Sequence, residues 1–302
     1  MTRFPPYLKP GDEIGILCPA GFMPHEKAQT AIATLKEWGF KVKVGRTLGN
    51  QFHYFSGTDA ERLSELQEML DDKKLKAILC ARGGYGVSRI IDKLKFKKFK
   101  KHPKWIIGFS DITLLLNHLY SNLKLASLHA PMAAAFNDGE QSNMYIQSLH
   151  DALVGRQALY STTGHQLNRS GKTKGVLVGG NLALLAHACG TLSDFNPEKK
   201  LLVLEDIGEY IYNVDRMLYQ LKRSGKLDGL NGLIIGKFSD MKDTTIPFGK
   251  STVEVIREIV NDYDYPVCYD YPVSHEKENY ALKIGGKYEL TVSTTSVQLE
   301  EL

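Results

Sequence analysis

The sequence predicts an α/β protein, with a doubly wound parallel sheet in the first half of the chain and a smaller, β-rich mixed domain in the second. Two observations carry this prediction. In the first half, short apolar runs alternate with helical patterns, which is typical of a parallel sheet with helices on both faces. In addition, 302 residues are many for a single core, so the length favours two domains.

The first half supplies its strands and helices in alternation. The expected strands are 13–18, 40–44, 77–80 and 105–107, and the expected helices are 27–38, 59–70 and 87–94. Ligands of such sheets bind at the carboxyl ends of the strands. Three of these ends carry unusual loops, namely Pro19-Ala20-Gly21, Arg82-Gly83-Gly84-Tyr85-Gly86 and Gly108-Phe109-Ser110-Asp111.

The second half begins after a polar stretch, 137–173, in which the periodic pattern weakens. We therefore predict a first domain over 1–150, a linker over 151–173 and a second domain over 174–302. In the second domain the expected strands are 174–178, 201–204, 232–236, 283–284 and 288–292, and the expected helices are 181–188 and 214–224.

Composition excludes several function classes. The formal charge of +4 is concentrated in the lysine run 93–104, which a solvated helix end explains as well as a nucleic-acid site does. Because no nucleic-acid motif accompanies this run, we expect no nucleic-acid partner. The four cysteines show no metal-ligand spacing, so reduced thiols and no metal are expected. No apolar run of signal-peptide or membrane-span length is visible, which favours the cytoplasm and no membrane partner.

The stretch WIIGFSDITLLL, residues 105–116, places Ser110 between a strand and a helix. This arrangement is similar in logic to the nucleophile elbow G-x-S-x-G, although Ile112 stands where the second glycine would be. The amide of Asp111, at the start of the helix, could then hold an oxyanion. Serine is also a preferred helix cap, so the local sequence leaves both roles open.

The loop 82–86 contains three glycines directly after a predicted strand. Glycine lets backbone amides approach a ligand closely, so the loop could supply a second oxyanion donor or cradle a phosphate. It lacks the lysine and serine of a P-loop, and its spacing differs from the dinucleotide fingerprint.

A serine nucleophile needs a base, which is usually histidine. Among nine histidines, His118 and His187 fall in apolar helical patterns and His129 is ambiguous. His275 lies in the polar loop 271–279, where functional residues concentrate.

The base in turn needs a carboxylate to orient it. Glu205 and Asp206 follow a four-residue apolar strand, although either could simply end that strand. Asp111 is a poor orienter, because it is adjacent to Ser110 at a helix start.

Several segments occur in a recognisable order along nearly the whole chain: 11–16 with Pro19-Ala20, 82–86, 108–113, Leu128-His129-Ala130-Pro131-Met132, Gly179-Gly180-Asn181-Leu182, Leu204-Glu205-Asp206, Gly236-Lys237-Phe238 and His275. Together they resemble the LD-carboxypeptidase family of serine peptidases, which includes muramoyltetrapeptide carboxypeptidases and microcin C immunity peptidases. One departure is visible: the family usually has glycine before the catalytic histidine, where this chain has Ser274, and a downstream Leu-Pro pair, where it has Leu282-Lys283.

The resemblance implies a Ser-Glu-His triad of Ser110 as nucleophile, Glu205 as orienter and His275 as general base and acid. It places the oxyanion hole on the amides of Asp111 and Gly83. It also implies a first domain like the class I glutamine amidotransferases, a homodimer, and no metal or organic cofactor. The triad would be drawn from both domains, so their relative placement should control activity.

The implied reaction is hydrolysis of the amide between an L-centre diamino acid and a terminal D-alanine in murein tetrapeptides, in cell-wall recycling. Gly84, Arg82 and Lys237 are candidate substrate-binding residues, and Arg216 is a further candidate for the terminal carboxylate. One alternative is an immunity-type peptidase that cleaves aminoacyl-nucleotide conjugates, with Tyr210 and Tyr212 as candidate stacking residues. A non-catalytic binding protein on the same fold is the alternative from another class.

Overall fold

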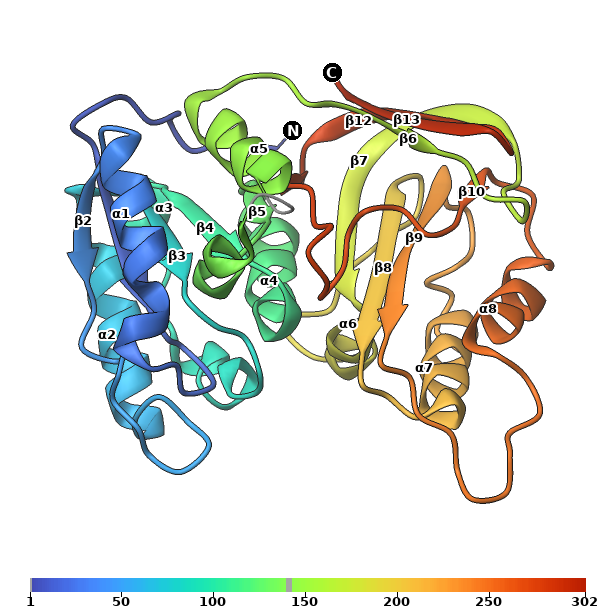
Figure 1. Cartoon of the computed structure of the whole chain (residues 1–302), viewed down its shortest axis with the longest axis horizontal. Coiled ribbons are helices and arrows are strands. Elements are labelled where there is room, and N and C mark those ends of the chain that lie inside the picture. The colour runs from blue at the N-terminus through green and yellow to red at the C-terminus, as the bar shows by residue number, and fades with distance from the viewer. Residues whose placement is uncertain (1, 140–142) are drawn as a thin grey trace. The chain divides into compact units, whose positions relative to one another are not determined.

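A computed structural model describes residues 2–139 and 143–302 (Figure 1). Within these residues the chain forms two compact units. The first unit takes the chain up to Arg156 together with Tyr280–Ile284, and the second takes Gln157–Asn279 and Gly285–Leu302.

The sheet of the first unit is mostly parallel. Its strands are β1 (Glu13–Leu17), β2 (Lys41–Val44), β3 (Leu75–Cys80), β4 (Trp105–Gly108), β5 (Ser127–His129) and β11 (Leu282–Ile284). They lie in the order β11-β5-β4-β3-β1-β2, and β11 pairs antiparallel with β5. The order of the parallel strands reverses between β1 and β3, which is where open α/β sheets bind ligands.

Helices pack against this sheet and bury its apolar side chains. They are α1 (Gln29–Glu37), α2 (Asp59–Asp71), α3 (Lys97–Lys101), α4 (Thr113–Leu123) and α5 (Asn143–Val154). Strands β1, β3 and β4 in the interior of the sheet are almost wholly buried and mainly apolar, whereas the edge strand β2 alternates lysine with valine and is largely exposed. In α3, Phe99 is buried while the neighbouring lysines face solvent, so this basic run is a helix with one solvated face.

The sheet of the second unit is mixed. Its strands are β6 (Leu159–Thr163), β7 (Gly171–Asn181), β8 (Leu201–Ile207), β9 (Gly232–Ser239), β10 (Val267–Cys268), β12 (Lys287–Val292) and β13 (Ser296–Glu301). The order is β10-β9-β8-β7-β12-β13-β6, with β7 to β10 parallel and the β12, β13 and β6 pairings antiparallel. Its helices are α6 (Leu182–Ala188), α7 (Ile211–Arg223) and α8 (Thr252–Val260). The two-sheet α/β class and the β-rich end of the second half are as predicted.

One expected helix differs from the structure, and a strand lies within the expected linker. The helix expected over 87–94 is instead a pair of 3-10 turns, Val87–Arg89 and Ile91–Lys93. The Val87 amide bonds a side chain of another loop, and Ile90 leaves helical geometry with φ −121°. The expected linker 151–173 contains β6, and the chain returns to the first unit at β11 because that strand pairs with β5. The boundaries 1–150, 151–173 and 174–302 remain a prediction for domains as independent folding units.

The four cysteines, all within the described part of the chain, are free thiols, and three of them are buried. Among the described residues, no helix combines the length and apolar character that crossing a membrane requires.

Candidate active site

Ser110 stands at a strained turn directly after strand β4. Its φ is +60°, in the left-handed region that non-glycine residues seldom occupy. Such strain persists where the surrounding structure imposes it, and it concentrates at functional sites. Ser110 also begins the 3-10 turn Ser110–Ile112, with Phe109 in the cap position before it. The geometry therefore agrees with an elbow that presents a side chain and not with serine as the cap of the helix.

Gly83 lies directly against this turn. A Cβ atom on Gly83 would stand 2.8 Å from Cβ of Ser110, 3.0 Å from its Oγ and 3.2 Å from the Asp111 amide nitrogen. Only glycine allows this approach, because contacts under 3.0 Å force the neighbouring backbone to shift. The Gly83 carbonyl in turn accepts a hydrogen bond of 2.9 Å from the Gly21 amide. The structure thus brings together the three strand-end loops that the sequence marks as unusual.

The Asp111 side chain fastens the glycine loop to the turn. Its Oδ2 accepts a hydrogen bond of 2.8 Å from the Val87 amide, and the residue is fully buried. Burial raises the pKa of this carboxyl to about 6, against the opposing hydrogen bond from Val87. The carboxylate therefore holds a loop, while the Asp111 backbone amide remains the predicted oxyanion donor.

Arg62 of α2 provides a second fastening and was not anticipated from the sequence. Its guanidinium is fully buried and donates to the carbonyls of Pro19 (2.8 Å) and Gly86 (3.1 Å). It also pairs with Asp59. One buried cation thus joins the loops that follow β1 and β3, which fixes the backbone beside Ser110.

In the second unit, Glu205 and His275 form an ion pair. Nδ1 of His275 lies 2.6 Å from Oε2 of Glu205, and the Glu205 side chain is fully buried. A carboxylate on Nδ1 fixes the ring orientation and makes Nε2 the nitrogen that can exchange a proton. The sequence resemblance assigns these two residues the roles of orienter and base, and those roles remain a prediction.

The backbone explains how residues 70 positions apart meet. Glu205 sits in β8 at a register shift, since Leu204 pairs with Ile235 but Asp206 pairs with Phe238. Bulges of this kind re-aim side chains and are frequent beside active sites. The segment before His275 runs along β9, where the Lys237 amide donates to the Val273 carbonyl at 3.1 Å.

The charge balance of the pair favours protonated histidine. Burial by itself lowers the pKa of His275, but the charge and hydrogen bond of Glu205, together with Asp206, outweigh it and raise the pKa above 6.5. Burial, followed by the charge of Glu205, raises the pKa of Asp206 to about 7. Asp206 itself accepts hydrogen bonds from the Asn181 side-chain amide and the Ala183 backbone amide, so it supports the turn after β7.

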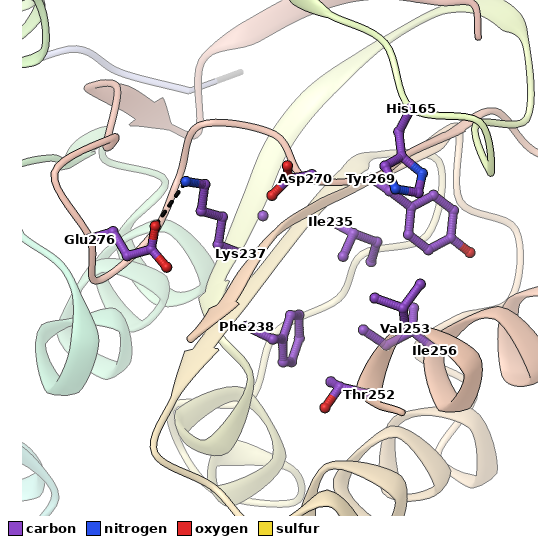
Figure 2. A pocket seen from close by; sticks show the side chains of 11 residues that line it. His165, Ile235, Lys237, Phe238, Thr252, Val253, Ile256, Tyr269, Asp270 and Glu276 are labelled. Atoms are coloured by element: carbon purple, nitrogen blue, oxygen red, sulfur yellow. Dashed lines mark hydrogen bonds and ion pairs between the residues drawn. The ribbon is translucent and has the colours of Figure 1, made fainter. Parts of the chain in front are cut away.

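A pocket of about 290 Å³ opens beside the His275 loop, within the second unit. Figure 2 shows an apolar floor from Ile235, Phe238 and α8, with Tyr269 and His165 on one side and Lys237 reaching toward Glu276 on the other. Lys237 bonds Glu276 at 2.8 Å and Glu278 at 3.1 Å. A substrate carboxylate at Lys237 would therefore compete with two glutamates.

The remaining candidate residues lie in different environments. Arg82 donates from its side chain to the Phe22 carbonyl at 2.5 Å, and Gly84 has a φ of +89° beside the Tyr54 hydroxyl. Arg216 bonds Asn213 and lies over the Tyr212 ring. Their substrate-binding roles remain predictions. Within the described residues, no group of three or more His, Cys, Asp or Glu side chains has a metal-binding arrangement.

Two family models match this chain: the LD-carboxypeptidase N-terminal domain over residues 14–130 and the LD-carboxypeptidase C-terminal domain over residues 174–290. The chain belongs to the LD-carboxypeptidase family. A probable murein peptide carboxypeptidase of Bacillus subtilis is 34% identical over 98% of this chain and 94% of its own length. The crystal structure of muramoyltetrapeptide carboxypeptidase from Oxalobacter formigenes matches with a TM-score of 0.87 and 29% identity, covering 96% of this chain and 98% of that one.

Another relative bears a different name. The microcin C7 self-immunity protein MccF of Escherichia coli is 25% identical over 96% of this chain and 94% of its own length. Both LD-carboxypeptidase domains are thus present in order, and the first domain model covers Ser110 while the second covers Glu205 and His275.

Proposed function

We propose that the protein is a serine carboxypeptidase that releases D-alanine from murein tetrapeptides in cell-wall recycling. The single observation that carries the proposal is the 2.6 Å contact between His275 Nδ1 and Glu205 Oε2. Family membership and the strained turn at Ser110 support it, since they supply the third group of a Ser-Glu-His triad. The names of the murein and muramoyltetrapeptide relatives support the substrate class.

The proposed reaction proceeds through an acyl-enzyme. Ser110 Oγ attacks the carbonyl carbon of the amide between the L-centre and D-alanine, and its proton passes to Nε2 of His275. The carbonyl oxygen becomes an oxyanion held by the amides of Asp111 and Gly83. Collapse breaks the C–N bond, and the leaving amine of D-alanine takes the proton from Nε2. A water molecule, deprotonated by His275, then hydrolyses the ester and restores Ser110.

The chain's own residues account for the main catalytic contributions. Each oxyanion donor of this type lowers the activation barrier by about 2.7–4 kcal/mol. Disturbing the close contact of Gly83 with Ser110 should therefore lower the reaction rate strongly. Glu205 stabilises the imidazolium form of His275 that arises after the proton transfer. Arg82 and Gly84 are proposed to bind the substrate, whereas the ammonium group of Lys237 is already paired with Glu276 and Glu278.

The substrate assignment is tested by incubating the purified protein with a murein tetrapeptide that ends in D-alanine and with its L-alanine diastereomer. Our proposal predicts that D-alanine is released from the first peptide and that little alanine is released from the second. Equal release from both would contradict the proposed stereochemistry at the scissile amide.

An immunity-type peptidase is the second candidate. It is favoured by the stacked pair Tyr210 and Tyr212, whose ring centroids are 5.6 Å apart and which are both about two-fifths exposed. A nucleobase could stack on such a surface. A hydrolysis rate for an aminoacyl-adenylate analogue that exceeds the rate for tetrapeptide, and that falls in Y210A and Y212A, would favour this function over the murein one.

A non-catalytic binding protein is the candidate from another class. A serine-directed acylating probe separates it from both peptidase functions, because the probe labels only an activated serine. We further propose a homodimer, a cytoplasmic location and a doubly wound first domain like the class I glutamine amidotransferases.

A further inference from the structure

Two glutamates follow the proposed base in the sequence, and one lysine binds them both. Glu276 and Glu278 lie one and three residues after His275. Lys237 Nζ lies 2.8 Å from Oε2 of Glu276 (Figure 2). It also lies 3.1 Å from Oε2 of Glu278. A single cation therefore holds the His275 loop at two points on its carboxyl side.

Strand β9, which carries Lys237, holds the His275 loop at two further points. The Lys237 amide donates to the Val273 carbonyl at 3.1 Å, before His275. The Ser239 hydroxyl donates to Oε1 of Glu276 at 2.8 Å, after it. Lys237 and Ser239 both belong to β9, so one rigid strand fixes the loop on both sides of the histidine.

A turn inside the loop completes the arrangement. The Ser274 hydroxyl accepts from the Glu276 amide at 3.0 Å and donates to the Glu278 carbonyl at 2.8 Å. Ser274 is fully buried, so its side chain forms an internal brace for the turn. The loop is therefore braced from within by Ser274 and is attached to β9 through the Lys237 ammonium group, the Lys237 amide and the Ser239 hydroxyl.

Strand β9 is also the neighbour of the strand that carries the acid. Leu204 and Asp206 on β8 pair with Ile235 and Phe238 on β9, so Lys237 lies beside the backbone of Glu205. A Cβ atom on Gly236 would stand 3.1 Å from Cβ of Glu205 and 2.2 Å from the Val273 carbonyl oxygen. The acid and the histidine loop are thus packed against the same two residues of β9.

We propose that Lys237 is a positioning residue, which clamps Glu276 and Glu278 to β9 and thereby holds His275 in register with Glu205. The inference rests on the proposed function, because it assigns His275 the role of base. The Lys237 side chain is one-quarter exposed and the two glutamates are more exposed, so these ion pairs add little to overall stability. Their effect is on geometry, and a misplacement of about 1 Å can reduce a rate by about 100-fold.

The first test compares K237M with K237R and with the control K174M. Lys174 pairs with Glu289 at 2.9 Å in the same unit but on the β7–β12 ladder, so it matches the chemistry of the clamp away from the loop. We expect K237M to lower kcat for D-alanine release by about 10- to 100-fold with little change in KM. K237R should recover most of the loss, and K174M should leave kcat unchanged. A wild-type kcat in K237M would overturn the proposal.

A second variant, E276Q/E278Q, separates the clamp from direct binding of a substrate carboxylate. If Lys237 clamps the loop, this variant loses kcat as K237M does, because the same ion pairs are removed. If Lys237 binds the substrate carboxylate, E276Q/E278Q frees the ammonium group, KM does not rise, and K237M raises KM instead of lowering kcat. The latter result would overturn the clamp.

The pH dependence of kcat is a further test, because it would not change if Lys237 only stabilised the fold. The charged groups around His275 are Glu205 and Asp206 from β8, Lys237 from β9, and Glu276, Lys277 and Glu278 of its own loop. K237M leaves two carboxylates without their cation, so the acid limb of kcat should move to higher pH. E276Q/E278Q removes those carboxylates, so the limb should move to lower pH while kcat falls in both variants. Identical profiles in the two variants would contradict the clamp.

Amide hydrogen exchange tests the loop directly in the intact protein. Protection of peptides that cover 273–279 should fall in K237M and not in K174M. The outcome is distinguishable from failure of the proposed function: if exchange is altered as expected but wild-type protein releases no D-alanine, the proposed activity is wrong. If the wild type is active while exchange in K237M equals that of the wild type, the clamp is wrong.

Discussion

The imidazole of His275 is oriented by a buried carboxylate, since its Nδ1 lies 2.6 Å from Oε2 of Glu205. The two residues come from different parts of the second half of the chain, one from strand β8 and one from a loop. An imidazole held in this way offers Nε2 for proton transfer.

Replacing the carboxylate should disable the base while preserving the fold. E205Q keeps the shape of the side chain but removes the negative charge that stabilises the imidazolium. We expect kcat for D-alanine release to fall by about 10⁴-fold, as for the equivalent change in other triads. The control is E258Q, which changes an exposed glutamate of α8 that pairs with Lys250. Activity of E205Q within a few-fold of wild type would remove Glu205 from the orienting role.

The pH dependence of activity has a predictable sign. A base must be neutral, and the pKa of His275 is raised above its ordinary 6.5, chiefly because the charge and hydrogen bond of Glu205 outweigh burial. Activity should therefore rise with pH through a limb centred above 6.5. In E205Q the carboxylate is gone while burial remains, so the residual activity should have its limb at lower pH. A kcat/KM profile measured from pH 5 to 9 checks both statements. A limb whose midpoint lies at higher pH in E205Q than in the wild type would contradict them.

The same pKa shift links the ion pair to folding. Because the folded-state pKa of His275 is above its unfolded value, the pair stabilises the fold fully below pH 6.5 and loses this contribution as pH rises through the folded pKa. The difference in unfolding free energy between wild type and H275Q should therefore be larger at pH 6 than at pH 9. A difference that does not change over this range would count against a charged pair in the folded state.

Gly83 should not accept a side chain. In G83A, Cβ would lie 2.8 Å from Cβ of Ser110, so the turn or the loop must shift. Losing one oxyanion donor lowers kcat by about 10²- to 10³-fold, which is the expected loss. G232A, on β9, is the matched control, because the three atoms nearest to its Cβ would be side-chain atoms of Leu201, Leu290 and Thr173 at 3.1–3.2 Å. Wild-type kcat in G83A would place the second donor elsewhere.

Asp111 should act through its hydrogen bond to the glycine loop. D111A leaves the buried Val87 amide without its acceptor, which should lower the unfolding free energy by about 1–3 kcal/mol. D111N keeps an acceptor oxygen for the Val87 amide. It also replaces the buried carboxyl group, whose pKa burial raises to about 6, with a neutral amide. We therefore expect D111N to be clearly more stable than D111A at pH 7. Urea unfolding of the two variants measures the difference. Equal stability would show that the hydrogen bond contributes little.

The sequence alone suggests those candidate site residues that lie at strand ends or in polar loops. Ser110 after β4, Glu205 near the end of β8 and the loop around His275 are recognisable because strand ends and polar loops are local features. The Gly83 loop and the Ser110 turn were expected to be neighbours because parallel strands end on one edge, and the structure confirms their contact.

The residues that hold these groups could not be found in the same way. Arg62 is a buried cation in α2 whose partners come from two other loops, and nothing in its local pattern distinguishes it from a surface helix residue. Charge and position alone suggest substrate binding for Lys237, because its glutamate partners are about 40 residues away in sequence and leave no mark on its local pattern. The return of β11 to the first sheet depends on its pairing with β5. The three-residue sequence of this strand is too short to predict that pairing. All three depend on long-range contacts and not on local periodicity.

The central claim is that Ser110 is the nucleophile, and D-alanine release from murein tetrapeptide by wild type and S110A tests it most directly. The variant should fold normally, because it removes one partly exposed hydroxyl from an existing turn. Our account predicts that release falls to background in S110A, and that mass spectrometry of the wild type treated with a serine-directed acylating probe finds the adduct on Ser110. Turnover by S110A close to that of the wild type would contradict it.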